Sequence, residues 1–240
     1  MKFLFIILFY FVLISNVDAW NSKGHQTVAE YAYYNSGFEL QNKLNLTLMK
    51  QGSTAPDLVF HDVVKHHYPP SYYLAERWLQ AAKDNYSLKD YNKASYAFGI
   101  ASHYISDSFV APHYISKEPS SLHSEFERIK NYSFNLECYK ANFNLNQSLE
   151  QASKNKEDWT KWTLTKDEEI PRRAYKGALN LTSLVFLDIF NSTCNNFKTE
   201  IIKQSFRLNN NIIIFFLLIA ICYFSFVLNK KYGFTKRIRF

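Results

Sequence analysis

Glycine is scarce in this chain, with 6 residues among 240. Alternating strand-like runs separated by Gly-rich turns are missing, which argues against an all-β fold. Cysteine is scarce as well, and Cys138, Cys194 and Cys222 are far apart in the sequence. This spacing does not indicate a thiol nucleophile or a cysteine metal site, and whether Cys138 and Cys194 form a disulfide stays open.

Acidic residues are fewer than basic ones, 21 against 28, which gives a formal net charge of +7. Most of this excess lies at the two ends of the chain. Without Lys2, Asp18 and the five basic residues of 229–240, the region Trp20–Asn211 carries only about +2. The basic balance therefore gives little support for nucleic-acid binding, and we expect no specific nucleic-acid partner.

The N-terminus has the features of a cleaved signal peptide, residues 1–19. Lys2 precedes an apolar run from Phe3 to Ile14 that is too short to span a bilayer comfortably. The sequence Val17-Asp18-Ala19 offers a cleavage site, so the mature chain is expected to begin at Trp20. The free amine of Trp20, with a pKa near ~8, could then bind a metal ion together with the adjacent carbonyl oxygen.

A second apolar run, Ile212–Leu228, carries no charge and is long enough to span a bilayer. The basic segment 229–240 follows it, which predicts a cytoplasmic C-terminus. The expected organisation is a domain over 20–194, a polar stalk over 195–211, a transmembrane helix over 212–228 and a basic tail over 229–240. The protein is thus predicted to be a single-pass protein of the cell membrane, with the domain outside the cell.

Helical periodicity dominates the region between these ends. Apolar residues recur at helical spacing most clearly along Tyr91–Phe109. No repeat of 20 to 50 residues is evident. We therefore expect one all-α domain, a compact multi-helix fold. The helices are predicted over Thr27–Tyr34, Tyr72–Asp84, Tyr91–Phe109, Ser124–Lys130 and Arg173–Phe190.

One short window holds an unusual set of polar side chains: His103, Asp107, His113, His123 and Glu127. His103 and Asp107 are four residues apart, as are His123 and Glu127, so each pair shares one face of a helix. Each pair brings one nitrogen and one oxygen to a common point. Two such pairs with a histidine between them predict a zinc site with more than one ion.

Further candidate ligands precede this window. His25 follows Trp20 closely, and Asp57 precedes the adjacent histidines His66 and His67. Six of the seven histidines are candidate ligands, and only His61 has no candidate function. This favours a metal centre over separate structural roles.

These residues, in this order, resemble the zinc-dependent phospholipase C family, which is similar in fold and metal site to the S1/P1-type nucleases. The resemblance runs from Trp20 to about Tyr132. It rests on the N-terminal Trp20 followed by a histidine, on Asp57, on a histidine before an aromatic residue, on His-x3-Asp-x5-His and on His-x3-Glu. The proline that follows favours His66 as the ligand, whereas the aromatic neighbour Tyr68 favours His67, which we prefer.

The resemblance implies a compact phospholipase C/P1 nuclease-like helical domain that holds three zinc ions. Trp20 and His25 would bind the first with Asp107 bridging; His67, His103, Asp107 and Asp57 the second; and His113, His123 and Glu127 the third. Asp57 is also the expected catalytic residue, which orients or deprotonates water. In choline-preferring members an acid and an aromatic residue hold the headgroup, but this chain has Lys23 and Leu58 in those places.

The implied activity is hydrolysis of a phospholipid to diacylglycerol and a phosphorylated headgroup, with a phospholipid or a membrane surface as partner. Two other functions stay open. One is an S1/P1-type nuclease acting on single strands, and the other is a non-catalytic surface domain stabilised by zinc. The sequence leaves the headgroup and the oligomeric state undetermined.

Overall fold

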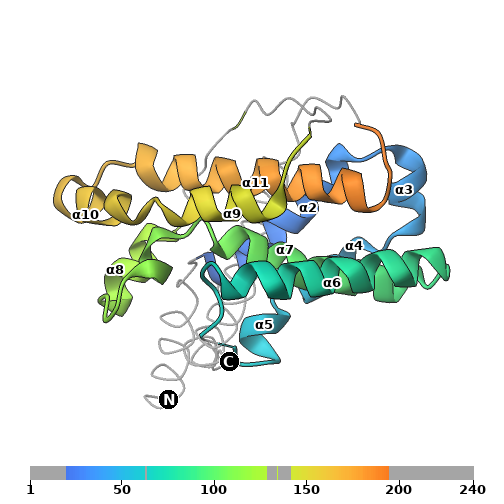
Figure 1. Cartoon of the computed structure of the whole chain (residues 1–240), viewed down its shortest axis with the longest axis horizontal. Coiled ribbons are helices and arrows are strands. Elements are labelled where there is room, and N and C mark those ends of the chain that lie inside the picture. Colours follow the sequence, from blue (N-terminus) through green and yellow to red (C-terminus); the bar gives the residue numbers. More distant parts are fainter. Residues whose placement is uncertain (1–19, 63, 129–133, 135–141, 195–240) are drawn as a thin grey trace, which may run out of the picture. The chain divides into compact units, whose positions relative to one another are not determined.

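The computed structural model describes residues 20–62, 64–128, 134 and 142–194. These residues belong to one compact unit, residues 1–197. Apart from an isolated bridge between Ser36 and Cys194, the regular structure among them is helical (Figure 1), which confirms the all-α prediction. The elements are η1 (Trp20–Gly24), α2 (His25–Asn35), α3 (Phe38–Lys43), α4 (Leu46–Gly52), α5 (Ala55–Leu58), α6 (Pro70–Ser87), α7 (Tyr91–Asp107), η2 (Ala111–Tyr114), α8 (Ser120–Phe126), α9 (Leu145–Ser153), α10 (Lys156–Thr165) and α11 (Glu169–Ile189).

Both terminal segments lie outside the described residues. The signal peptide (1–19), the stalk (195–211), the transmembrane helix (212–228) and the tail (229–240) therefore stay predictions. Among the residues that the structure does describe, no helix has the length and apolar character to cross a bilayer. Cys194 is disulfide-bonded, whereas Cys138 and Cys222 fall outside the described ranges.

Four of the five predicted helices match α2, α6, α7 and α11 within about one turn at each end. The expected helix over Ser124–Lys130 instead begins earlier and ends at Phe126 as α8, because Pro119 at its N-cap position fixes where the helix can start. The helix expected to reach Phe109 stops at Asp107, with Ser108 as its C-cap, and a separate short helix η2 begins at Ala111.

Several of the six prolines lie in the first turns of helices. Pro56 and Pro70 occupy the first two positions of α5 and α6, and Pro171 lies within the first turn of α11. A proline is tolerated there because the backbone N–H groups of the first turn have no partner within the helix. Their effect is to start helices rather than to separate them.

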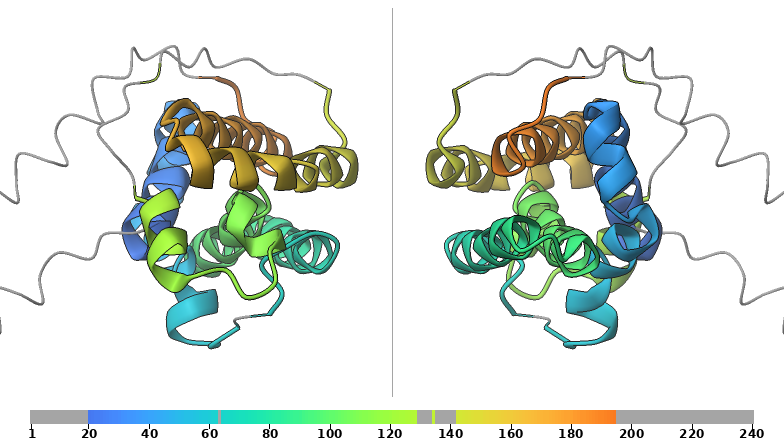
Figure 2. Two further views of the ribbon diagram at one scale, coloured as in Figure 1. Left: turned by 90° about the vertical axis from the view of Figure 1, so that its left-hand side faces the viewer. Right: turned by 90° about the vertical axis from the view of Figure 1, so that its right-hand side faces the viewer.

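Helix α7 lies at the centre of the domain and packs against α2, α4, α5, α6 and α11. Most of its residues from Ala94 onward are buried. Figure 2 shows α9, α10 and α11 above α7, with α6 beside α7 on one flank and the segment α2–α4 on the opposite flank. A polar side chain on α7 is therefore held in place from several directions and shielded from water.

Glycines let α4 and α7 approach closely. A Cβ on Gly99 of α7 would lie only 2.9 Å from the Cα of Gly52, and would collide with the carbonyl oxygen of Met49. Any larger residue at either glycine would push the two helices apart. This crossing sets Ser53, the residue after α4, against the next turn of α7, where His103 lies.

Candidate metal centre

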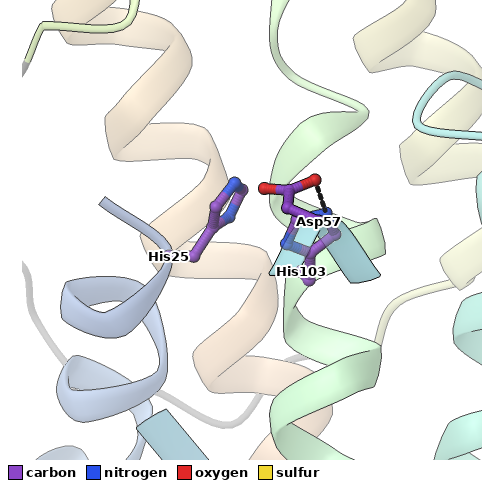
Figure 3. Close-up of side chains that lie close together, drawn as sticks. All are labelled: His25, Asp57 and His103. Carbon is purple, nitrogen blue, oxygen red and sulfur yellow. Dashed lines mark ion pairs between the residues drawn. The ribbon is translucent and has the colours of Figure 1, made fainter. Parts of the chain in front are cut away.

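Three side chains from distant parts of the chain converge at the middle of the domain. His25 begins α2, Asp57 lies in α5 and His103 lies on α7, and Figure 3 shows them pointing toward one another. One ligand atom from each lies within 4.8 Å of the other two. Asp57 Oδ1 is 3.5 Å from His103 Nε2, and both histidines are almost fully buried.

Asp107, the last residue of α7, is the centre of this arrangement. Its Oδ2 lies 3.0 Å from His103 Nε2 and 2.8 Å from His66 Nδ1, and its Oδ1 lies 3.3 Å from His25 Nε2. The i, i+4 spacing of His103 and Asp107 thus places both on one face of α7, as the sequence predicted. A carboxylate with its two oxygens on different partners is suited to bridge two ions.

The two adjacent histidines separate, and the structure differs from the preference for His67. His66 reaches both Asp107 and, at 3.6 Å, Asp57 Oδ1, and it shares a group with Asp107 and His113. The ring of His67 instead packs edge-on against Tyr114 with centroids 6.0 Å apart. Only His66 therefore belongs to the group of candidate ligands, and His67 packs beside it.

A second group lies beside the first. It consists of His113 in η2, His123 in α8 and Glu127 just after α8. Glu127 Oε1 is 2.9 Å from His123 Nε2 and 3.3 Å from His113 Nε2. We call His25, Asp57, His66, His103 and Asp107 the inner cluster, and His113, His123 and Glu127 the outer cluster.

The rings of four histidines are oriented through Nδ1, which leaves Nε2 facing the carboxylates. His103 Nδ1 donates to the carbonyl oxygen of Ser53 at 2.9 Å, and His113 Nδ1 to that of Asp107 at 3.3 Å. Holding one ring nitrogen as a donor fixes the tautomer and leaves the other nitrogen's lone pair for a metal ion. The remaining contacts are His25 Nδ1 to Ser106 Oγ at 2.9 Å and His123 Nδ1 to Glu118 Oε1 at 2.8 Å.

The hydroxyl of Ser106 determines which nitrogen of the His25 ring carries a proton. Ser106 Oγ donates its proton to the carbonyl oxygen of His103 at 2.9 Å. Its oxygen must therefore accept the proton on His25 Nδ1. Burial, aided by the nearby His103, lowers the pKa of His25 to about 3, so His25 is a neutral imidazole.

The rest of the inner cluster carries charge. Burial opposes charge on both His66 and Asp107, but the carboxylate and imidazole groups that face each other outweigh it. Contact with Asp107 raises the pKa of His66 to about 9, and the surrounding histidines hold the pKa of Asp107 well below its usual range. Burial raises the pKa of Asp57, which favours proton acceptance at a higher pH than an ordinary aspartate.

The outer cluster is a network of ion pairs. Despite burial, its two carboxylate neighbours raise the pKa of His123 to about 9. Hydrogen bonds from His113 and His123 likewise outweigh burial and lower the pKa of Glu127 to about 2. A negative Glu127 beside two imidazoles is a nitrogen and oxygen donor set that suits zinc.

The inner cluster has donor atoms that the protein does not satisfy. His66 Nε2, His103 Nε2 and both carboxylate oxygens of Asp107 are buried and lack a hydrogen bond of suitable geometry. Buried polar atoms without partners are costly, and these four converge on one region. Imidazole nitrogens and carboxylate oxygens without thiolates form a donor set that zinc accepts, so the residues fit a zinc site.

The expected role of Trp20 as a metal ligand stays a prediction, because its side chain is not among the parts of the chain that the structure describes. Other supporting residues had not been anticipated. Glu118, Ser106 and the backbone of Ser53 each hold the far nitrogen of a histidine. Only Glu118 left a sequence signal, since an acid five residues before His123 can reach its ring. The contact of Ser53 depends on the crossing of α4 and α7.

An all-α domain with adjacent histidine and carboxylate clusters has the features of a metal-binding protein with more than one candidate metal site. Residues 24–177 match the sequence model of the family described as zinc dependent phospholipase C. This match covers more than half of the chain, which therefore belongs to the zinc-dependent phospholipase C family and is a zinc hydrolase. No curated protein matches the chain significantly.

Proposed function

We propose that this protein is a membrane-anchored phospholipase C that acts outside the cell. It would hydrolyse the glycerol-side phosphate ester of a phospholipid, releasing diacylglycerol and a phosphorylated headgroup. The family implies a phospholipid substrate. The apolar runs 3–14 and 212–228, and the basic segment 229–240, support the location.

The observation that carries the chemistry is the convergence of unsatisfied nitrogen and oxygen atoms around Asp107. Zinc bound there would lower the pKa of water and neutralise charge on a phosphate. His25, His66 and His103 hold their nitrogens toward this region, and Asp107 compensates the positive charge. The substrate would enter from the side of Asp57, the most exposed carboxylate of the inner cluster, at 34%.

Asp57 is placed to act as the general base. It lies 3.5 and 3.6 Å from His103 and His66, so its carboxylate is held at the edge of the cluster rather than at its centre. Its raised pKa makes it a better proton acceptor than an ordinary aspartate. In this role Asp57 Oδ would take the proton of the attacking water.

Zinc analysis and product analysis together test the proposal. The protein is produced with its natural N-terminal segment, so that processing can generate Trp20 as the first residue, and is then incubated with phospholipid vesicles or with single-stranded DNA. We expect two to three zinc ions per chain, because the structure has three candidate groups of ligands, and we expect chelator-sensitive release of diacylglycerol. Release of 5′-nucleotides alone would instead indicate a nuclease.

A variant separates catalysis from metal-stabilised folding. Asp57→Asn keeps the shape of the side chain but removes its basicity. We expect the rate of lipid hydrolysis to fall by at least about 10²-fold, the usual contribution of general base catalysis, with the thermal stability retained. A zinc-containing protein that hydrolyses neither substrate would favour the third possibility, a binding domain.

A further inference from the structure

Four large apolar side chains are exposed beside the metal centre. Leu58, Val59, Phe60 and Val64, which we call the apolar rim, are 60%, 61%, 44% and 68% exposed. Single exposed apolar residues are common on soluble domains. Here four of them gather in one short segment, which makes this surface different from its surroundings.

Both ends of this segment are fixed in the inner cluster. Asp57 directly precedes Leu58, and His66 follows Lys65. The apolar rim must therefore lie at the edge of the metal centre, on the side where Asp57 is exposed. Figure 2 shows α5 and the chain that follows it projecting from the helices of the domain.

Many backbone N–H groups of the segment already have acceptors inside the domain. Six of them donate to acceptors within the same region, which lowers the cost of placing this backbone in an apolar medium. The bonds are Leu58 to Thr54 O (3.0 Å), Val59 and Phe60 to Ala55 O (both 2.9 Å), Asp62 to Pro56 O (3.0 Å), and Val64 and Lys65 to Asp62 Oδ1 (3.3 and 3.2 Å).

The charged side chains of the segment also suit contact with an apolar medium. Asp62 is its one acid, and its Oδ2 accepts a hydrogen bond from the hydroxyl of Tyr104 at 3.0 Å. Tyr104 neighbours His103 on α7, so this bond also ties the segment to the inner cluster. The exposed charge is Lys65, whose long side chain can lie along apolar surface while its ammonium group reaches a phosphate.

We propose that the apolar rim enters the surface of a phospholipid bilayer and so brings Asp57 and His66 to the level of the headgroups. The proposal rests on the function proposed above, because it names the surface through which the enzyme meets its substrate. Exposed apolar side chains, six hydrogen-bonded backbone N–H groups, an acid bound to Tyr104 and an exposed lysine together fit a lipid surface better than water. A second copy of the chain would need no lysine at this position.

The first test does not depend on activity. The full chain is reconstituted into vesicles, with or without brominated phosphatidylcholine, as wild type, as Val59→Trp and as Leu88→Trp. Leu88 is 78% exposed and follows α6, which separates it from Pro70 by about 27 Å. We expect the emission added by Val59→Trp to be quenched by bromine and that added by Leu88→Trp to persist. Equal quenching of both, or quenching of neither, would overturn the proposal.

The second test compares two substrates with one set of proteins. Val59→Ser/Val64→Ser should hydrolyse vesicle lipid about tenfold more slowly, or worse, because burial of one such side chain contributes about tenfold in an equilibrium constant. Hydrolysis of a short-chain phospholipid dissolved as monomers should be unchanged. The matched control is Leu88→Ser/Leu164→Ser, two side chains 78% and 80% exposed, which should alter neither rate.

The outcomes separate the two proposals. Equal losses on both substrates would mean that the rim supports the metal centre rather than the membrane contact, and no loss on vesicles would mean that it does not touch lipid. If the wild type hydrolyses neither substrate, the phospholipase function fails, while bromine quenching still decides where the rim lies.

Discussion

The inner and outer clusters use the same side-chain types but differ in how far the protein satisfies them. His25, His103 and Asp107 are at most 3% exposed, and four ligand atoms of the inner cluster lack a hydrogen bond of suitable geometry. In the outer cluster, His123 is 21% exposed and pairs with carboxylates through both nitrogens. The inner cluster is therefore organised for a cation, whereas the outer cluster already compensates its own charges.

This difference has a structural origin. The inner cluster is built on α7, a 17-residue helix held from several sides, with α2 and α5 packed against it. The outer cluster is built on η2 and α8, elements of 4 and 7 residues near the surface. We expect zinc in the inner cluster to hold the domain together and zinc in the outer cluster to be removed more easily.

The largest expected effect is that of Asp107→Asn. Removing this charge leaves buried histidines around a neutral amide, and breaking a buried charge pair typically destabilises a protein by about 3–5 kcal/mol. Activity should be lost together with zinc from the inner cluster. Denaturant unfolding, zinc content and diacylglycerol release measure the three effects. Glu127→Gln is the outer counterpart, and an equal or greater destabilisation by it would remove the distinction between the clusters.

The second effect acts on the inner cluster from a distance. Gly99→Ala would force α4 away from α7 and weaken the contact between the carbonyl oxygen of Ser53 and His103. Overpacking of this kind costs about 1–3 kcal/mol, and inner zinc should bind more weakly while outer zinc is kept. Gly37→Ala is the control, since its Cβ would approach Thr193 Oγ1 only to 3.1 Å. A wild-type zinc affinity in Gly99→Ala would contradict this role for the crossing.

The sequence could predict those parts of the fold and site that depend on local spacing. The i, i+4 pair His103 and Asp107 needs only a helix, and the apolar periodicity of α7 supplied it. The long helices α6, α7 and α11 were found for the same reason. Helices α3, α4 and α5 have at most 7 residues, too few for periodicity to identify. Packing positions two of them: α4 packs against α2 and α7, and α5 packs against α4 and α7.

Local spacing in the sequence could not predict contacts between distant segments. Either His66 or His67 suits the spacing of the family pattern, and only the path of the chain between α5 and α6 decides that His66 faces Asp107. Likewise, Ser53 is a backbone partner, for which no side-chain pattern exists. The exposure of Leu58 and Val59 was also hidden, because apolar residues of this kind are normally expected in the core.

The third effect concerns the outer cluster and tests whether the two clusters bind zinc independently. Glu118→Gln removes the carboxylate that accepts the Nδ1 proton of His123 at 2.8 Å. Loss of such a partner weakens metal binding by about 10–100-fold, and the effect should be confined to the outer cluster. Competition with a zinc chelator would resolve the two affinities. Glu125→Gln, on the same helix as His123 but paired with Lys166, should change neither affinity. A loss of inner zinc in Glu118→Gln would show that the clusters are not separate.

The smallest effect is a pH dependence. As the pH rises, the stability of the metal-free protein should fall, whereas its affinity for zinc should rise. In the metal-free protein, His66 and His123 have pKa values of about 9, raised above 6.5 by their carboxylate partners against the effect of burial. A raised pKa in the folded protein stabilises it below pH 6.5, and this stabilisation is lost as the pH rises through about 9. Zinc binding needs these nitrogens deprotonated, so zinc affinity should rise over the same interval.

Thermal unfolding between pH 6.5 and 9, with zinc or with a chelator, measures this difference. The metal-free protein should lose stability as the pH rises, and the gap between the two forms should widen. Glu118→Gln removes one carboxylate beside His123, so the decline of its metal-free form should be shallower than that of the wild type. If the metal-free wild type were instead as stable at pH 9 as at pH 6.5, His66 and His123 would not carry the protons assigned to them, and their imidazoles would be neutral before zinc binds.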